Sequence, residues 1–177
     1  MRNKQKGFSL IELLIVVAII LIIAAIAIPN LLRSKMAANE ASAVGSLRTM
    51  VTADVTYNST YGNQFAPDLP TLGGPPAASA TCNASLLIDN TLANAIVAAT
   101  PKSGYFFTYL AGTPITNNPP GCTAGALSFA IQANPAVYGQ TGNRYFCTDQ
   151  TGVIRFDPTA VVAATGIGGC TGGTPLQ

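Results

Sequence analysis

The chain has 177 residues, of which 49% are hydrophobic and 9% are charged, and its formal net charge is +2. It contains no histidine, which removes the commonest general base and a leading metal ligand. Beyond Gly62 the few charged residues form no basic stripe, so the electrostatic footprint of a nucleic-acid-binding protein is missing. The carboxylates are scattered, and neither a phosphate-binding glycine loop nor a nucleophile elbow occurs. We therefore expect no enzymatic activity, no metal or other cofactor, and no nucleic-acid partner.

A basic flank followed by a long apolar run begins the chain. Arg2, Lys4 and Lys6 precede the 21 residues 8–28, which as a helix span about 30 Å, the thickness of one hydrocarbon core. A basic flank before the span predicts that the N-terminus stays cytoplasmic and that the rest is exported. A signal peptide cleaved near residues 25–27 is the alternative. Its apolar region is usually only about 7–15 residues long, so a retained anchor is favoured.

One carboxylate, that of Glu12, lies inside this apolar run. The 16 residues 13–28 that follow it carry no polar side chain. An unpaired carboxylate at the centre of a bilayer costs roughly 2.5–3.5 kcal/mol even on the mildest insertion scales. Either Glu12 lies at the headgroup boundary, within reach of water, or it pairs with a cation.

The residues around Glu12 carry a family resemblance. Residues 7–14 read GFSLIELL, with a glycine, a phenylalanine next to it and a glutamate five residues after the glycine, and the apolar run continues to Pro29. This pattern resembles the prepilin motif of type IV pilins and type II secretion pseudopilins, and is most like a type IVa major pilin. The resemblance covers about the first fifty residues.

The resemblance implies how the N-terminus is processed. Residues 1–7 would be a leader peptide, and a membrane-embedded prepilin peptidase would cut between Gly7 and Phe8 and methylate the new amine of Phe8. Glu12 would then pair with the positive Phe8 amine of a neighbouring subunit. Such a pair in a low-dielectric environment compensates the desolvation of both charges.

The resemblance also implies partners and a location. It implies a homo-oligomeric helical filament, built by an assembly platform and an ATPase from precursors in the bacterial inner membrane and displayed at the cell surface. The favoured function is therefore a structural subunit of a type IV pilus. The alternatives are a secretion pseudopilin, whose filament stays periplasmic, and a minor pilin acting in adhesion. Major pseudopilins typically lack disulfides and carry a late calcium-binding loop, whereas this chain has four cysteines and few acidic residues in its last part.

Helical patterning continues beyond Pro29. Proline lacks an N–H and clashes with the preceding turn, so a kink is predicted there. Charged residues, including Glu40 and Asp54, fall mostly between apolar residues spaced three and four apart, namely Leu32, Met36, Val44, Leu47, Val51 and Val55. We predict one long kinked helix over residues 8–61, with 8–28 as the membrane or filament core and 30–61 amphipathic.

Residues 62–177 are predicted to form a globular head. The prolines of residues 65–80 exclude a regular helix there, while residues 90–99 are predicted as a short helix capped by Asn90 or Thr91. The pattern predicts strands at residues 105–110, 127–132, 144–148 and 153–156, the last two forming a hairpin. The predicted fold class is α+β, with the long helix packed on an antiparallel sheet of about four strands.

Four cysteines, Cys82, Cys122, Cys147 and Cys170, lie beyond the membrane segment. Without a C-x-x-C pair or a histidine they do not fit a metal site, and an exported chain enters an oxidising compartment where disulfides form. Free buried thiols are the alternative. Three connectivities are possible from the sequence. The pairs Cys82–Cys122 and Cys147–Cys170 are favoured, because the second would close a C-terminal loop that resembles the one in many pilins.

Overall fold

The longest element of the chain is a helix that contains a proline. The structure, a computed structural model, describes residues 8–75 and 79–176. Helix α1 spans Leu10–Tyr61 with Pro29 inside it, so the predicted long helix is confirmed, while the kink at Pro29 stays a prediction. The helix is followed by Gly62 with a φ of 62°, the left-handed conformation that glycine adopts without a side-chain penalty.

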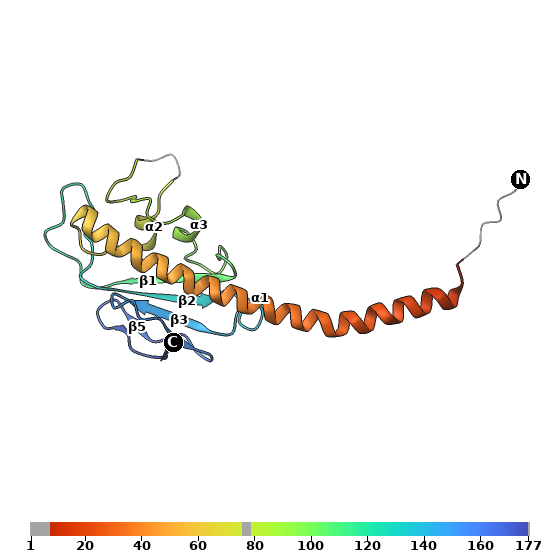
Figure 1. The fold of residues 1–177 in the computed structure, drawn as a ribbon. Helices are drawn as coiled ribbons and strands as arrows, with labels where there is room; N and C mark the ends of the chain where they lie inside the picture. The colour runs from red at the N-terminus through yellow and green to blue at the C-terminus, as the bar shows by residue number, and fades with distance from the viewer. Residues whose placement is uncertain (1–7, 76–78, 177) are drawn as a thin grey trace, which may run out of the picture. The chain divides into compact units, whose positions relative to one another are not determined.

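The chain divides into two compact units, Met1–Lys35 and Met36–Gln177. The second unit contains an antiparallel five-stranded sheet in the order β1-β2-β3-β4-β7 (Figure 1). Its strands are β1 (Tyr105–Ala111), β2 (Phe129–Pro135), β3 (Tyr145–Asp149), β4 (Arg155–Asp157) and β7 (Thr174–Pro175). The α+β class and the β3–β4 hairpin are therefore confirmed. The edge strand β7 was not predicted, because two residues are too few to show a period.

One face of the sheet is covered by the second part of α1. Leu47, Met50 and Tyr57 of the helix belong to one buried cluster with strand residues, and none of these three side chains is exposed. The strand residues of this cluster are Tyr105, Phe107, Phe129, Ile131, Ala133 and Phe146. Burial of each large apolar side chain contributes about 1.5–3 kcal/mol. This cluster therefore fixes residues 36–61 of the helix on the sheet.

The buried face of α1 differs from the predicted one. Glu40 and Asp54, predicted between the apolar positions, are 9% and 0% exposed, whereas Val55 is 56% exposed. The predicted stripe followed large apolar residues, but the helix also buries small ones such as Ala43 and Ala53, which rotates the inner face. Glu40 is compensated by Arg144, whose Nε lies 3.0 Å from its carboxylate.

Two short helices correct the predictions for the loop after α1. Helix α2 (Leu69–Leu72) forms inside the segment where prolines were expected to exclude helix. Pro70 lies in its first turn, where the missing N–H is not needed, and the Asp68 carboxylate caps it by accepting from the Thr71 amide at 2.9 Å. Helix α3 (Asn90–Ala93) is shorter than predicted, and Asp89 is its N-cap.

The opposite face of the sheet carries a small two-stranded ribbon formed by β5 (Ala164–Thr165) and β6 (Gly169–Cys170). Ala130, Cys147, Val162 and Cys170 form a second buried cluster there. Strand β2 is thus buried on both faces in its middle. Leu127, the first residue of the strand predicted at 127–132, precedes β2 and is 56% exposed.

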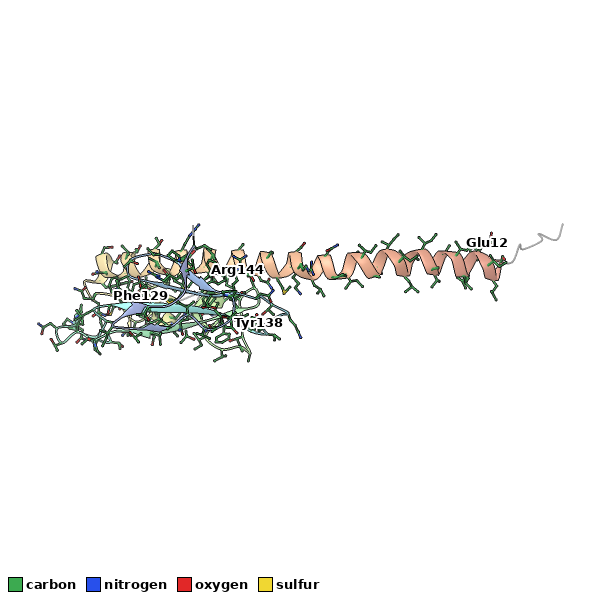
Figure 2. The ribbon with its side chains drawn as sticks, turned by 90° about the horizontal axis from the view of Figure 1, so that it is seen from below. Glu12, Phe129, Tyr138 and Arg144 are labelled. Carbon is green, nitrogen blue, oxygen red and sulfur yellow. A yellow bond between two sulfur atoms is a disulfide. The ribbon has the colours of Figure 1, made fainter. Side chains whose placement is uncertain are left out.

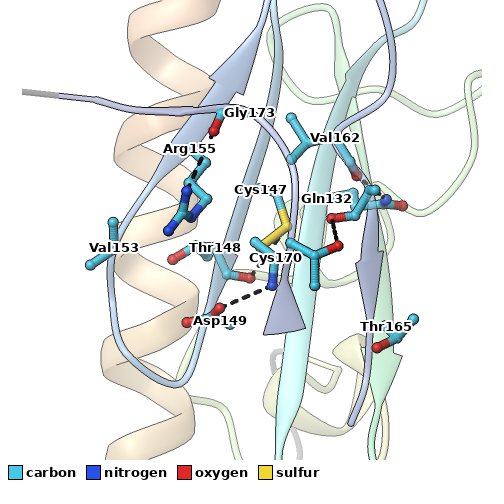
Figure 3. Close-up of a disulfide and its surroundings, with 12 residues drawn as sticks. Gln132, Cys147, Thr148, Asp149, Val153, Arg155, Val162, Thr165, Cys170 and Gly173 are labelled. Atoms are coloured by element: carbon cyan, nitrogen blue, oxygen red, sulfur yellow. Dashed lines mark hydrogen bonds between the residues drawn. A yellow bond between two sulfur atoms is a disulfide. The ribbon is translucent and has the colours of Figure 1, made fainter. Parts of the chain in front are cut away.

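Two disulfides, Cys82–Cys122 and Cys147–Cys170, join distant parts of the head, and the described residues hold no free cysteine. Figure 3 shows the second disulfide between β3 and β6. Beside it, the Asp149 carboxylate accepts a hydrogen bond from the Cys170 amide at 3.0 Å. Side-chain hydrogen bonds therefore hold the C-terminal ribbon on the sheet together with the covalent link.

We predict that each disulfide stabilises the head measurably. The two bonds close segments with sequence separations of 40 and 23 residues, and loops of this size contribute about 3–4 kcal/mol in the chain-entropy model. Replacing Cys82 and Cys122 together by serine should lower the free energy of unfolding by this order in denaturant titrations of the full chain in detergent. Replacing Cys147 and Cys170 should do nearly the same. An unchanged free energy of unfolding in either double variant would contradict the prediction.

Candidate functional site

The first unit presents an apolar helix surface. The large apolar side chains from Phe8 to Leu32 are 46–78% exposed, and by length and composition alone α1 is able to cross a membrane. A contiguous apolar surface of this size belongs in lipid or against other protein. The residues that carry it are therefore the first candidates for a functional surface.

Glu12 lies in the first turn of this helix (Figure 2). Its Oε2 accepts a hydrogen bond from the backbone N–H of Ser9 at 3.0 Å, and the carbonyl of Ser9 accepts from the Leu13 amide at 3.2 Å. Ser9 and Glu12 thus show the contact by which the glutamate of a capping box reaches back to the N-cap amide. A carboxylate at this position also interacts favourably with the positive end of the helix dipole.

The capping role of Glu12 was missed in the sequence, although its signal was present. A serine followed three residues later by a glutamate, just before an apolar run, is a helix-start pattern. The contact involves one carboxylate oxygen, Oε2, and within the described residues Oε1 accepts no hydrogen bond. One oxygen of the carboxylate therefore has no hydrogen-bond donor in the part of the chain that the structure describes.

The predicted site residues are placed as follows. Gly7, on one side of the expected cleavage, lies outside the described residues, whereas Phe8 on the other side is 78% exposed. Phe8 lies two residues before the start of α1 at Leu10, and Glu12 lies in the first turn of that helix. Next to Pro29, the Asn30 side-chain amide donates to the carbonyl of Ile26 at 3.1 Å. The four cysteines all belong to the second unit.

The arrangement is suited to charge pairing and apolar packing. In the part of the chain that the structure describes, no group of three His, Cys, Asp or Glu residues is placed to hold a metal ion. The described part of the N-terminal unit offers one carboxylate, with an oxygen that accepts no hydrogen bond there, on an exposed apolar helix surface. Such a surface associates with lipid or with other apolar helices, and the carboxylate selects a cationic partner.

Comparisons with known proteins point to the same N-terminal segment as the structure does. The family model described as "Prokaryotic N-terminal methylation motif" matches residues 2–28. The chain is 38% identical over 131 residues to the type IV wide pilus major component PilA4 of Thermus thermophilus, covering 68% of this chain and 97% of that protein. It is 45% identical over 73 residues to the type IV major pilin protein PilA of Myxococcus xanthus, covering 37% of this chain and 33% of that protein.

A third relative is the type IV major fimbrial protein FimA of Dichelobacter nodosus, 44% identical over 68 residues, with 37% of this chain and 44% of that protein covered. No solved structure matches the chain. The PilA4 similarity extends over nearly the whole length of that relative, and the methylation motif coincides with the exposed apolar helix. The chain therefore belongs to the type IV pilin family, whose members are structural subunits of pili and not enzymes.

Proposed function

We propose that this pilin is a major subunit of a type IV pilus and joins the filament through Phe8 and Glu12. A prepilin peptidase removes residues 1–7 by cutting between Gly7 and Phe8, and the new amine of Phe8 is methylated. The observation that carries the proposal is the single carboxylate of Glu12, whose Oε1 accepts no hydrogen bond from the described residues, in the segment 8–32 whose large apolar side chains are all exposed. The methylation motif over residues 2–28 supports the processing step.

Before assembly, the precursor is held in the bacterial inner membrane by residues 8–28. The leader carries Arg2, Lys4 and Lys6, and basic residues beside a span favour the cytoplasmic side. The head then folds on the exported side of the membrane, where an oxidising environment permits the Cys82–Cys122 and Cys147–Cys170 bonds. This topology separates the leader from the head, so the peptidase acts on one side and folding occurs on the other.

The charge of Glu12 explains why a subunit leaves lipid for a filament. Apolar side chains gain little on moving from lipid tails to other apolar helices, because both surroundings are equally apolar. A lone carboxylate is different, since it is costly in lipid and becomes favourable beside a cation. Cleavage supplies that cation, because it turns the amide nitrogen of Phe8 into a terminal amine.

Pairing between subunits also fixes their relative position. If Glu12 of one subunit meets the Phe8 amine of the next, the two helices are held at one axial offset, and repetition of that offset builds a helical filament. The Ser9 amide occupies Oε2 of Glu12, so the amine of a neighbour binds Oε1. An assembly platform and an ATPase are the further partners that extrusion of such a filament to the cell surface needs.

The relatives favour a pilus over a secretion pseudopilin. The similar proteins named above are described as a wide pilus component, a major pilin and a major fimbrial protein. A periplasmic secretion filament would use the same helix chemistry, so its exclusion needs a direct measurement of where the processed chain is found.

We predict that material sheared from the cell surface contains a chain that begins at methylated Phe8. Mass spectrometry of the N-terminal peptide checks the cleavage, the methylation and the location in one experiment. The same peptide found only in membrane fractions would retain the processing but contradict a surface pilus. A peptide that still contains Gly7 would contradict the processing itself.

We also predict that Glu12→Gln abolishes filament assembly while membrane insertion and cleavage continue. Glutamine retains the side-chain oxygen that accepts from the Ser9 amide in a capping box, so this variant keeps the helix start and removes only the charge. Breaking a buried ion pair costs about 3–5 kcal/mol, which lowers the equilibrium constant for adding a subunit by more than about a hundredfold. Sheared filament yield, relative to the amount of processed pilin in membranes, is the measurement.

Glu12→Ala serves as the comparison variant, because it removes both the charge and the cap. Loss of filaments with Glu12→Ala but normal filaments with Glu12→Gln would assign Glu12 to helix capping and overturn the pairing. Equal loss with both substitutions supports the pairing.

A further inference from the structure

A buried carboxylate in the head has no role in the proposed assembly. Asp54 lies on α1 and is 0% exposed. Its Oδ1 accepts a hydrogen bond from the Ala66 amide at 2.9 Å, and the hydroxyl oxygen of Tyr109 lies 3.1 Å from the same Oδ1. The other oxygen, Oδ2, has no hydrogen-bond partner among the described residues. Three separate segments, namely α1, the stretch between α1 and α2, and strand β1, therefore meet at this carboxyl group.

The hydroxyl of Tyr109 has two acceptors and one proton. Its oxygen lies 2.9 Å from the carbonyl oxygen of Ala66 and 3.1 Å from Oδ1 of Asp54. A tyrosine hydroxyl donates a single hydrogen bond but also accepts. Both contacts are satisfied only if Tyr109 donates to Ala66 and Asp54, in its neutral form, donates to Tyr109. If Asp54 is ionised, its Oδ1 and the carbonyl oxygen of Ala66 compete for the single proton of the Tyr109 hydroxyl.

We propose that Asp54, Tyr109 and Ala66 form a proton-controlled latch, in which the charge of Asp54 decides whether the Tyr109 hydroxyl holds the carbonyl of Ala66. With neutral Asp54 the proton chain runs from Asp54 to Tyr109 to Ala66, and both the Tyr109 hydroxyl and the Ala66 carbonyl are hydrogen-bonded. With ionised Asp54 the hydroxyl turns to the carboxylate, because a hydrogen bond to a charged acceptor is the stronger one. The Ala66 carbonyl then loses its donor in a buried environment, which is unfavourable.

The packing around the latch leaves the hydroxyl proton as its movable part. The ring of Tyr109 stacks on that of Phe129 at a centroid distance of 5.7 Å and an interplanar angle of 9°. Phe129 is fully buried and meets Phe65 edge-on at 4.9 Å. Phe65 in turn exchanges two backbone hydrogen bonds with Ala126, at 2.9 and 3.0 Å. The Tyr109 ring is therefore fixed, and loss of the hydrogen bond at the Ala66 carbonyl acts on the segment that Phe65 pairs with Ala126, just before β2.

Among the described residues, the groups whose charges act on this site are acidic or phenolic. Tyr57 lies on the same helix, Tyr109 on β1, and Asp68 at the start of α2 adds only negative charge. Neither of the two ion pairs found among the described residues involves Asp54. Burial raises the pKa of Asp54 to about 7, although the hydrogen bonds from Ala66 and Tyr109 act in the opposite direction. The latch therefore changes state near neutral pH.

The sign of the pH effect on stability follows from this shift. The folded state keeps a proton on Asp54 that the unfolded chain, with a carboxyl pKa of 3.8, releases. Between about pH 4 and pH 7 the folded state thus binds more protons, so stability falls as the pH rises through this window. Above the folded-state pKa both states are ionised, and this contribution becomes constant.

The test is a carbon-13 NMR titration of the full-length pilin in detergent micelles. The Asp54 carboxyl resonance should titrate with a midpoint near 7, and the Ala66 carbonyl resonance should shift with the same midpoint. The thermal midpoint of unfolding should fall from pH 5 to pH 8. An Asp54 carboxyl that titrates near 3.8, or an Ala66 carbonyl that does not respond to it, would overturn the latch.

Two variants separate the latch from a merely buried acid. In Tyr109→Phe, Asp54 should still titrate, with a higher midpoint because the Tyr109 hydroxyl lowers its pKa in the wild-type protein. The Ala66 carbonyl resonance should no longer shift with the titration of Asp54. In Asp54→Asn, the pH dependence of the unfolding temperature should disappear. A Tyr109→Phe protein whose Ala66 carbonyl still follows Asp54 would contradict the role of the hydroxyl. The wild-type titration alone decides the outcome if the Asp54→Asn chain does not fold.

Discussion

The proposed assembly of this pilin depends on a single carboxylate on an apolar helix. Glu12 stands at the start of a surface whose large apolar side chains are all exposed in the isolated chain. Apolar contacts by themselves do not distinguish lipid from neighbouring helices, so the free-energy difference between the two states depends on the charge. Among the described residues Glu12 accepts one hydrogen bond, from the Ser9 amide, and this bond orders the helix start without supplying a positive charge. In the proposed assembly, the Phe8 amine of a neighbouring subunit in the filament compensates this charge.

The head meets a different constraint, because it has little regular structure between α1 and β1 and after β4. Long loops lose much conformational entropy when they are ordered, and the head offsets this with covalent and side-chain links to the backbone. Asn83, next to Cys82, donates to the Gly121 carbonyl at 2.9 Å and accepts from the Thr123 amide at 2.8 Å, so both sides of the first disulfide are tied. At the second disulfide, the Cys170 amide likewise donates to the Asp149 carboxylate, so a side-chain hydrogen bond again lies beside the covalent link. The loops of the head are therefore held by bonds that lie within the head itself.

Sequence patterns predicted the elements that are long or strongly periodic. The helix of Leu10–Tyr61 and the strands β1 to β4 follow from apolar spacing and from a glycine turn. Helix α2 was missed because its proline lies at a first-turn position that tolerates it. The burial of Asp54 was missed because a charged residue within an amphipathic pattern is expected on the outer face, and its partners Ala66 and Tyr109 come from distant segments. At Glu12 the apolar run revealed the unusual carboxylate, while its contact with Ser9 came from the structure.

Solid-state NMR of mixed filaments tests the central claim most directly. Filaments are assembled from two pools of pilin, one labelled with carbon-13 at the glutamate carboxyl and the other with nitrogen-15 at phenylalanine. The proposed pairing predicts strong dipolar transfer between the Glu12 carboxyl and the Phe8 amine, and this signal is necessarily intermolecular because the labels are on different chains. If transfer is seen only when both labels are on the same chain, Glu12 neutralises its own N-terminus, and pairing between subunits is contradicted.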